Sequence, residues 1–199
     1  NLVSFSDAHS FWPWRIGREA TIFDTKLTYK EILDAIRTGD GLTETVEVNP
    51  NYGKYHLDGH RACDVCLEPK ESNKNKKICP KCKKPMTIGV LNRVEELADR
   101  EENFKPKNAK AFRSLIPLSE ILSKVIGYGV ATQKTWKEFN NLIKNFHTEF
   151  NVLLEASSED LKKVTDDKIA DAIIKIRDND FEVKPGYDGV YGELILEQS

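Results

Sequence analysis

The chain has 199 residues, enough for one ordinary domain or two small ones. It is 39% hydrophobic and 31% charged, as in globular proteins, and no apolar run approaches the length of a membrane span. We therefore expect no membrane segment. The net charge of −2 hides a segregation, because residues 1–50 carry −3, residues 51–150 carry +7 and residues 151–199 carry −6. The basic middle suits either a polyanion partner or a solvated, lysine-rich surface.

The first fifty residues predict short strands around one helix. Thr28 can cap a helix over Tyr29–Thr38, and Gly39 can end it. The strand candidates are Leu2–Phe5, Ala20–Phe23 and Leu42–Val48. Strand, loop, strand, helix and strand in this order suit the end of a β/α domain.

Asp7 and His9 come directly after the first strand candidate. In extended backbone, residues i and i+2 point to the same side, so both side chains can reach one metal at the end of a strand. A carboxylate with an imidazole suits a divalent metal that activates water. The pattern is weak by itself, and its simpler interpretation is an Asp that caps a turn beside a solvent-facing His.

The next loop alternates aromatic residues with Arg15 and Arg18. This pattern suits base stacking and phosphate pairing, although tryptophans such as Trp12 and Trp14 more often pack at the end of a barrel. Further along, residues 54–61 hold two histidines four apart, but the glycines on either side indicate a loop that approaches a phosphate or packs beside the cysteines.

Four cysteines form two C-x-x-C pairs, Cys63 with Cys66 and Cys79 with Cys82, and these are all the cysteines in the chain. Each pair can place two thiolates on one side of a tight turn, so the two pairs predict a structural zinc site of four cysteines. A site of three cysteines and His60 is possible but not needed. Two disulfides or a redox pair are the alternatives, and they fit less well because the sequence opens without a signal-peptide pattern. We therefore expect a cytoplasmic protein.

From Val90 onward the apolar spacing is mostly helical. Helices are expected at residues 91–98, 120–126, 135–146, 161–164 and 168–177. Residues 185–192 are rich in glycine and resemble a turn. The fold class is therefore mixed α+β, with a β/α segment at 1–50, a zinc-ribbon-like insert at 51–90 and a helical domain at 91–199.

Taken together, these stretches resemble one protein family over nearly the whole chain. Residues 6–9 and 12–19 resemble the last metal motif of PHP (polymerase and histidinol phosphatase) domains, and more narrowly that of the endonuclease Q family. The resemblance continues, in the same order, through residues 53–61, both cysteine pairs, and residues 89–100, 114–118 and 185–192.

The resemblance implies a metal-dependent DNA-repair endonuclease that cuts the phosphodiester 5′ to deaminated bases or abasic sites. Such proteins have a distorted β/α barrel holding a cluster of Zn²⁺, Mn²⁺ or Mg²⁺, then a four-cysteine zinc domain and a helical C-terminal domain. By this resemblance Asp7 and His9 are the last pair of cluster ligands. The family's other cluster ligands, including an early His-x-His, are absent from the sequence. We therefore expect residues 1–50 to be the end of the barrel and the chain alone to be inactive.

The resemblance also makes DNA the expected partner. Candidate phosphate contacts are Arg15, Arg18, Lys54, Arg61 and Arg93. Two other functions stay open. One is a non-catalytic, zinc-containing module that binds nucleic acid or protein, and the other is a PHP phosphatase that acts on a small phosphoester.

Overall fold

The computed structural model describes residues 1–12 and 18–196, and the chain forms two compact units. Unit 1 comprises residues 1–48 and 107–180, and unit 2 comprises residues 49–106 and 181–199. The first unit boundary lies close to the predicted one at residue 50, and the division into three domains stays a prediction. Unit 2 includes the last part of the chain because that part returns to hydrogen-bond with residues 51–57.

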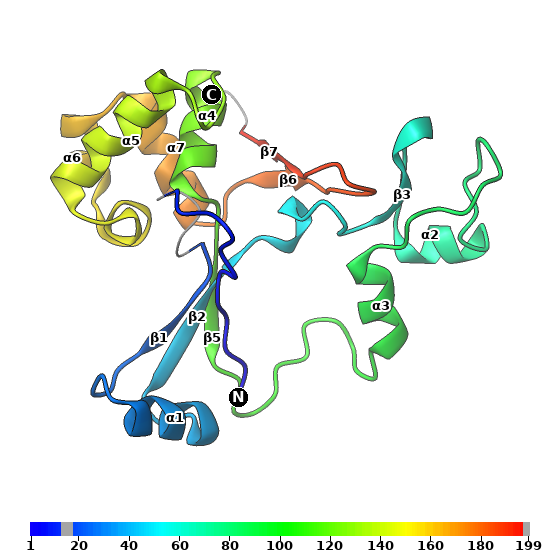
Figure 1. The fold of residues 1–199 in the computed structure, drawn as a ribbon, viewed down its shortest axis with the longest axis horizontal. Coiled ribbons are helices and arrows are strands. Elements are labelled where there is room, and N and C mark those ends of the chain that lie inside the picture. The colour runs from blue at the N-terminus through cyan, green and yellow to red at the C-terminus, as the bar shows by residue number, and fades with distance from the viewer. Residues whose placement is uncertain (13–17, 197–199) are drawn as a thin grey trace. The chain divides into compact units, whose positions relative to one another are not determined.

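Unit 1 contains a three-stranded sheet in the order β1 (Ala20–Phe23), β2 (Leu42–Val48) and β5 (Ala111–Leu115), visible in Figure 1. Strands β1 and β2 are antiparallel, whereas β2 and β5 are parallel, with Val46 opposite Arg113. The first two strands confirm the sequence prediction. Strand β5 was not predicted, because three of its five side chains are exposed and leave no apolar alternation.

Helix α1 (Tyr29–Thr38) lies between β1 and β2 in the chain and has the predicted ends. The Thr28 hydroxyl accepts a hydrogen bond from the Glu31 N–H, and Gly39 adopts a φ of 88°, which favours glycine. The strand predicted at Leu2–Phe5 is wrong. Residue Ser4 instead exchanges two hydrogen bonds with the hydroxyl of Thr21, so this segment is attached through a side chain rather than a strand ladder.

The rest of unit 1 is helical: α4 (Leu118–Ile126), α5 (Gln133–Phe146), a π-helical turn (Asn151–Glu155), α6 (Ser158–Val164) and α7 (Asp167–Arg177). The core of these helices is fully buried and apolar, and includes Leu118, Ile121, Leu122, Leu142, Val152, Leu161, Ile173 and Ile176. The Arg177 guanidinium donates to the carbonyl oxygens of Val152 and Leu153, which satisfies part of the irregular π turn. No helix in the described residues is long and apolar enough to cross a membrane.

Unit 2 contains two small antiparallel hairpins, β3 (Asp58–His60) with β4 (Val65–Leu67) and β6 (Glu182–Lys184) with β7 (Glu193–Ile195). Helices α2 (Pro69–Lys74) and α3 (Val90–Leu97) complete it. Asp58 is fully buried, and its carboxylate accepts hydrogen bonds from the Gly89 N–H at 2.7 Å and the Asn92 side-chain amide at 2.6 Å. This buried carboxylate fixes the start of α3 to the β3–β4 hairpin. The whole chain is thus a mixed α+β fold with small sheets and a helical C-terminal region, as predicted at that level.

Candidate metal centre

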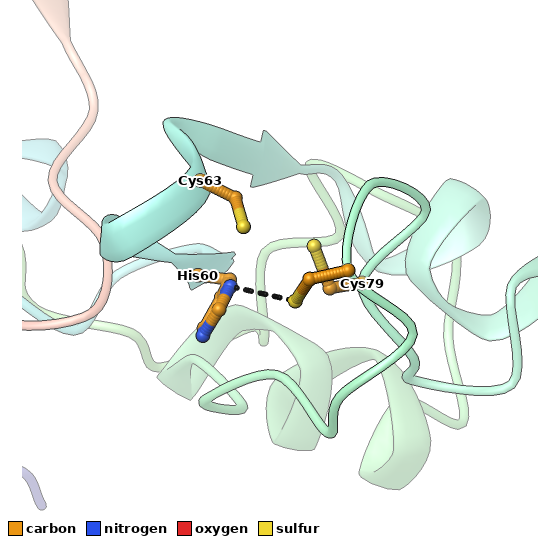
Figure 2. A group of neighbouring side chains, drawn as sticks. His60, Cys63 and Cys79 are labelled. Atoms are coloured by element: carbon orange, nitrogen blue, oxygen red, sulfur yellow. Dashed lines mark hydrogen bonds between the residues drawn. The ribbon is translucent and has the colours of Figure 1, made fainter.

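In the described part of the chain, one group of side chains has the make-up of a metal site: His60, Cys63, Cys79 and Cys82. One ligand atom from each lies within 4.8 Å of all the others. Figure 2 shows His60, Cys63 and Cys79 pointing toward one another, and the Cys82 Sγ lies 3.4 Å from His60 Nδ1. Side chains from two separate segments, residues 60–63 and 79–82, therefore converge on one point.

The second cysteine pair forms a tight turn around the Cys79 sulfur. The Cys79 N–H donates to the Lys84 carbonyl and the Lys83 N–H donates to the Cys79 carbonyl, with Lys83 in a left-handed conformation at a φ of 63°. Burial raises the pKa of the Cys79 thiol, but hydrogen bonds from the backbone N–H groups of Cys82 and Lys81, together with those of the Cys82 and His60 side chains, outweigh it by stabilising the thiolate. The net result is a pKa of about 6.

The first cysteine pair is divided, because Cys66 lies outside the group. Cys66 is exposed and lies in β4 between Val65, which belongs to a buried cluster with Cys79 and Met86, and Leu67, which packs against that cluster. Successive side chains of a strand point to opposite faces, so Cys66 points away from this cluster. On the ladder Cys66 is paired with Gly59, whereas Val65 is paired with His60. The alternation of side chains along the hairpin thus places His60 on the side of the cluster and Cys66 on the other side. The four-cysteine composition of the site stays a prediction.

The donor set fits zinc. Three soft sulfur ligands and one imidazole are a common tetrahedral shell for this ion. A hydrogen bond with Cys82, then burial and the neighbouring Cys79, raise the pKa of the Cys63 thiol to about 11. Close thiolates repel one another, and a bound divalent cation relieves that repulsion and keeps them deprotonated. Four protein ligands leave no open position, so the group can hold a structural metal such as zinc rather than a catalytic one.

The two residues predicted to hold the catalytic metals, Asp7 and His9, are exposed and do not lie in such a group among the residues that the structure describes. The side chains of Asp7 and His9 are 93% and 86% exposed, and His9 Nδ1 lies 2.8 Å from the Asp7 carbonyl oxygen. The two side chains lie close together in space, but they do not belong to any group of three or more metal-ligating side chains in the described residues. Their role as ligands stays a prediction.

The predicted phosphate contacts differ in their surroundings. Arg15 lies outside the described residues. The Arg18 side chain is 22% exposed, and its Nη2 lies 3.8 Å from Glu120. Arg93 pairs with Glu96 at 2.6 Å. Each of these carboxylates offsets part of the arginine's attraction for a phosphate.

Lys54 and Arg61 are better placed for a phosphate. Both are exposed, and neither has a carboxylate within ion-pair distance in the part of the chain that the structure describes. They are therefore the two predicted contacts whose charge is available to a partner.

The fold and the site define a class: a mixed α+β protein that combines a Cys/His centre suited to zinc with a helical region. Residues 117–180, within that helical region, match the family model of the MJ0043 C-terminal domain. The chain is 34% identical, over 98% of its length, to MJ0043, an uncharacterised protein of Methanocaldococcus jannaschii, of which it covers 25%. It is also 34% identical, over 97% of its length, to YqxK, an uncharacterised protein of Bacillus subtilis, of which it covers 46%.

Two solved structures share the fold. One is PfuEndoQ, a lesion-specific endonuclease of Pyrococcus furiosus, with 33% identity, a TM-score of 0.86, and coverage of 98% of this chain and 48% of that one. The other is endonuclease Q in complex with a 27-mer duplex that carries an abasic lesion at its active site, with 32% identity, a TM-score of 0.87, and coverage of 98% and 50%. The chain is a homologue of endonuclease Q and covers about its C-terminal half. The chain spans half the length, or less, of these relatives. The resemblance to endonuclease Q that was inferred from the sequence is confirmed.

Proposed function

We propose that this chain is the zinc-binding and helical part of a metal-dependent endonuclease that cuts DNA 5′ to abasic sites or deaminated bases. The observation that carries the proposal is similarity along 98% of the chain to an endonuclease solved with an abasic duplex at its active site. The parallel pairing of β2 with β5, and the position of α1 before β2, support the assignment of residues 1–50 to the end of a PHP barrel. Strand β1 departs from the parallel arrangement of such a barrel, because it is antiparallel to β2.

Within this proposal the two metal-binding regions have separate tasks. The Cys/His group is closed and holds its part of unit 2 in shape. Asp7 and His9 contribute to the catalytic cluster, for which the remaining ligands come from a further part of the complete protein. A divalent cluster bound there supplies Lewis acidity for hydrolysis of the phosphodiester. Two ligands alone bind a hard metal poorly, so the isolated chain is inactive.

A second candidate function is favoured by one observation. Because Asp7 and His9 are exposed and lack a third ligand among the described residues, the chain by itself suits a binding module better than a catalyst. In that case it recognises DNA through unit 2, and catalysis takes place elsewhere. The effect of Asp7→Ala on cleavage by the complete protein separates the two candidates, because only the first requires this side chain for catalysis.

The test uses the complete protein that carries this chain and a duplex with one abasic site. The wild type cuts the lesion strand, and Asp7→Ala reduces the cleavage rate by about 1,000-fold or more, as expected for loss of a group that acts on the transition state. Asp40→Ala, which removes an exposed carboxylate after α1, is the matched control and cuts normally. Undiminished cleavage by folded Asp7→Ala would overturn the ligand assignment.

A further inference from the structure

Beside the Cys/His group, unit 2 carries a surface of mixed aromatic and basic side chains, which we call the tyrosine platform: Lys54, Tyr55, Arg61 and Tyr191. The two tyrosines are 47% and 64% exposed, although tyrosine rings usually bury much of their apolar surface. The Lys54 Nζ lies 5.4 Å from the centroid of the Tyr55 ring and 5.7 Å from that of Tyr191. One ammonium group is therefore flanked by two exposed aromatic rings.

The platform is built on a rigid backbone. Residues 51–57 and 186–192 lie side by side, joined by hydrogen bonds from Gly186 N–H to Asn51 O (2.9 Å), Leu57 N–H to Gly186 O (3.0 Å), Gly189 N–H to Lys54 O (2.9 Å) and Gly192 N–H to Tyr52 O (3.1 Å). The approach is so close that a Cβ on Gly186 would clash with the Gly53 carbonyl oxygen, and one on Gly192 with that of Asn51. The two tyrosines, far apart in sequence, are thus held on adjoining segments.

The charge of the platform is offset only in part from within: the Thr87 hydroxyl, the Arg61 backbone N–H and then the Arg61 charge hold the pKa of the Asp188 carboxyl below its usual value. Asp188 is the neighbouring carboxylate, but it accepts hydrogen bonds from the Arg61 backbone N–H at 2.6 Å and the Thr87 hydroxyl at 2.5 Å. The Arg61 guanidinium instead reaches toward Gly189, where a Cβ would lie 3.6 Å from Arg61 Nη1 and 3.9 Å from the Tyr55 hydroxyl oxygen. The Arg61 guanidinium and the Tyr55 hydroxyl thus both border Gly189, and both side chains are exposed.

We propose that the tyrosine platform binds unpaired nucleotides of a DNA strand. The rings of Tyr55 and Tyr191 stack on bases, while Lys54 and Arg61 contact the phosphates. Exposed aromatic rings combined with basic groups are how proteins hold single strands without reading their sequence. An intact duplex hides the faces of its bases, so the platform prefers strands that are already open. The inference deepens the proposed function, which supplies DNA as the polyanion, by assigning a surface for nucleotides displaced around a lesion.

The test measures binding of the chain to a fluorescein-labelled oligothymidylate of about 12 nucleotides, close to an ordinary single-strand site, by fluorescence anisotropy. The double variant Tyr55→Ala/Tyr191→Ala weakens binding by about 25-fold or more, and Tyr55→Phe/Tyr191→Phe restores it because a phenyl ring still stacks. Lys54→Ala lowers the salt slope of log K by about 0.7 for one lost phosphate contact on a single strand. Tyr29→Ala, which removes an 83% exposed tyrosine of α1, is the control and binds normally.

With the oligothymidylate, three results would overturn the proposal: no binding at low salt, binding by the alanine double variant equal to wild type, or an equal loss in the phenylalanine variant. Equal weakening of a matched intact duplex would show a general phosphate surface and would also contradict it. The proposed function is tested separately by cleavage of abasic DNA. If abasic DNA is cleaved but the tyrosine variants bind oligothymidylate like wild type, the proposed function stands and the platform proposal is wrong. If the tyrosines are needed for oligothymidylate binding but abasic DNA is not cleaved, the platform proposal stands and the proposed function is wrong.

Discussion

Glu149 gives unit 1 a pH dependence that can be calculated from its surroundings. Burial raises the pKa of this carboxyl from 4.5 to about 7, and this effect outweighs a hydrogen bond from the Leu118 N–H (2.8 Å) and the attraction of Arg18. The folded state therefore favours the protonated carboxyl. A pKa difference of about 2.5 corresponds to roughly 3 kcal/mol, so the free energy of unfolding falls by about that amount as pH rises from 4.5 through 7.

The variant Glu149→Gln removes this term, because a neutral amide oxygen can still accept from the Leu118 N–H. We expect wild type and variant to unfold in urea with similar free energies near pH 4.5. At pH 8 the variant is more stable by up to about 3 kcal/mol. Glu159→Gln, an exposed carboxylate on α6, is the control and keeps the wild-type slope. A difference between Glu149→Gln and wild type that does not change with pH would refute the reasoning.

Two further predictions concern unit 2. Purified chain should hold about one zinc by metal analysis. The variants Cys79→Ser and His60→Ala should lose this zinc, whereas Cys66→Ser should keep it. Loss of zinc from Cys66→Ser together with retention in His60→Ala would show instead that the ligands are the four cysteines. Asp58→Ala should lower the free energy of unfolding by about 3 kcal/mol in urea titrations, because the Gly89 N–H and the Asn92 amide lose a buried, charged acceptor. An unchanged urea midpoint would mean that this buried contact contributes little.

Local signals in the sequence were sufficient for elements whose ends are set by their own residues. Helix α1 runs from Tyr29 to Thr38 as predicted, because Thr28 caps it and Gly39 ends it within the same short segment. Ser157 likewise caps α6 by accepting a hydrogen bond from the Asp160 N–H, although this helix begins at Ser158 and not at residue 161 as expected. Such caps need no information from elsewhere in the chain.

What depends on distant pairing could not be predicted in the same way. The choice between Cys66 and His60 follows from the register of β3 and β4, which sets the face to which each side chain points. The parallel pairing of β2 with β5 likewise joins segments separated by most of unit 2. The cysteine spacing located the candidate metal centre, but only three-dimensional packing shows that His60 lies in the group and Cys66 outside it.

The central claim is most directly tested by mapping the cut that the complete protein makes in a duplex with one abasic site, in the presence of divalent metal. We predict a single break on the 5′ side of the lesion, no break in the undamaged duplex, and no cleavage by this chain alone. Hydrolysis of a small phosphomonoester with no cleavage of the lesion strand would contradict it, because the site would then belong to a phosphatase.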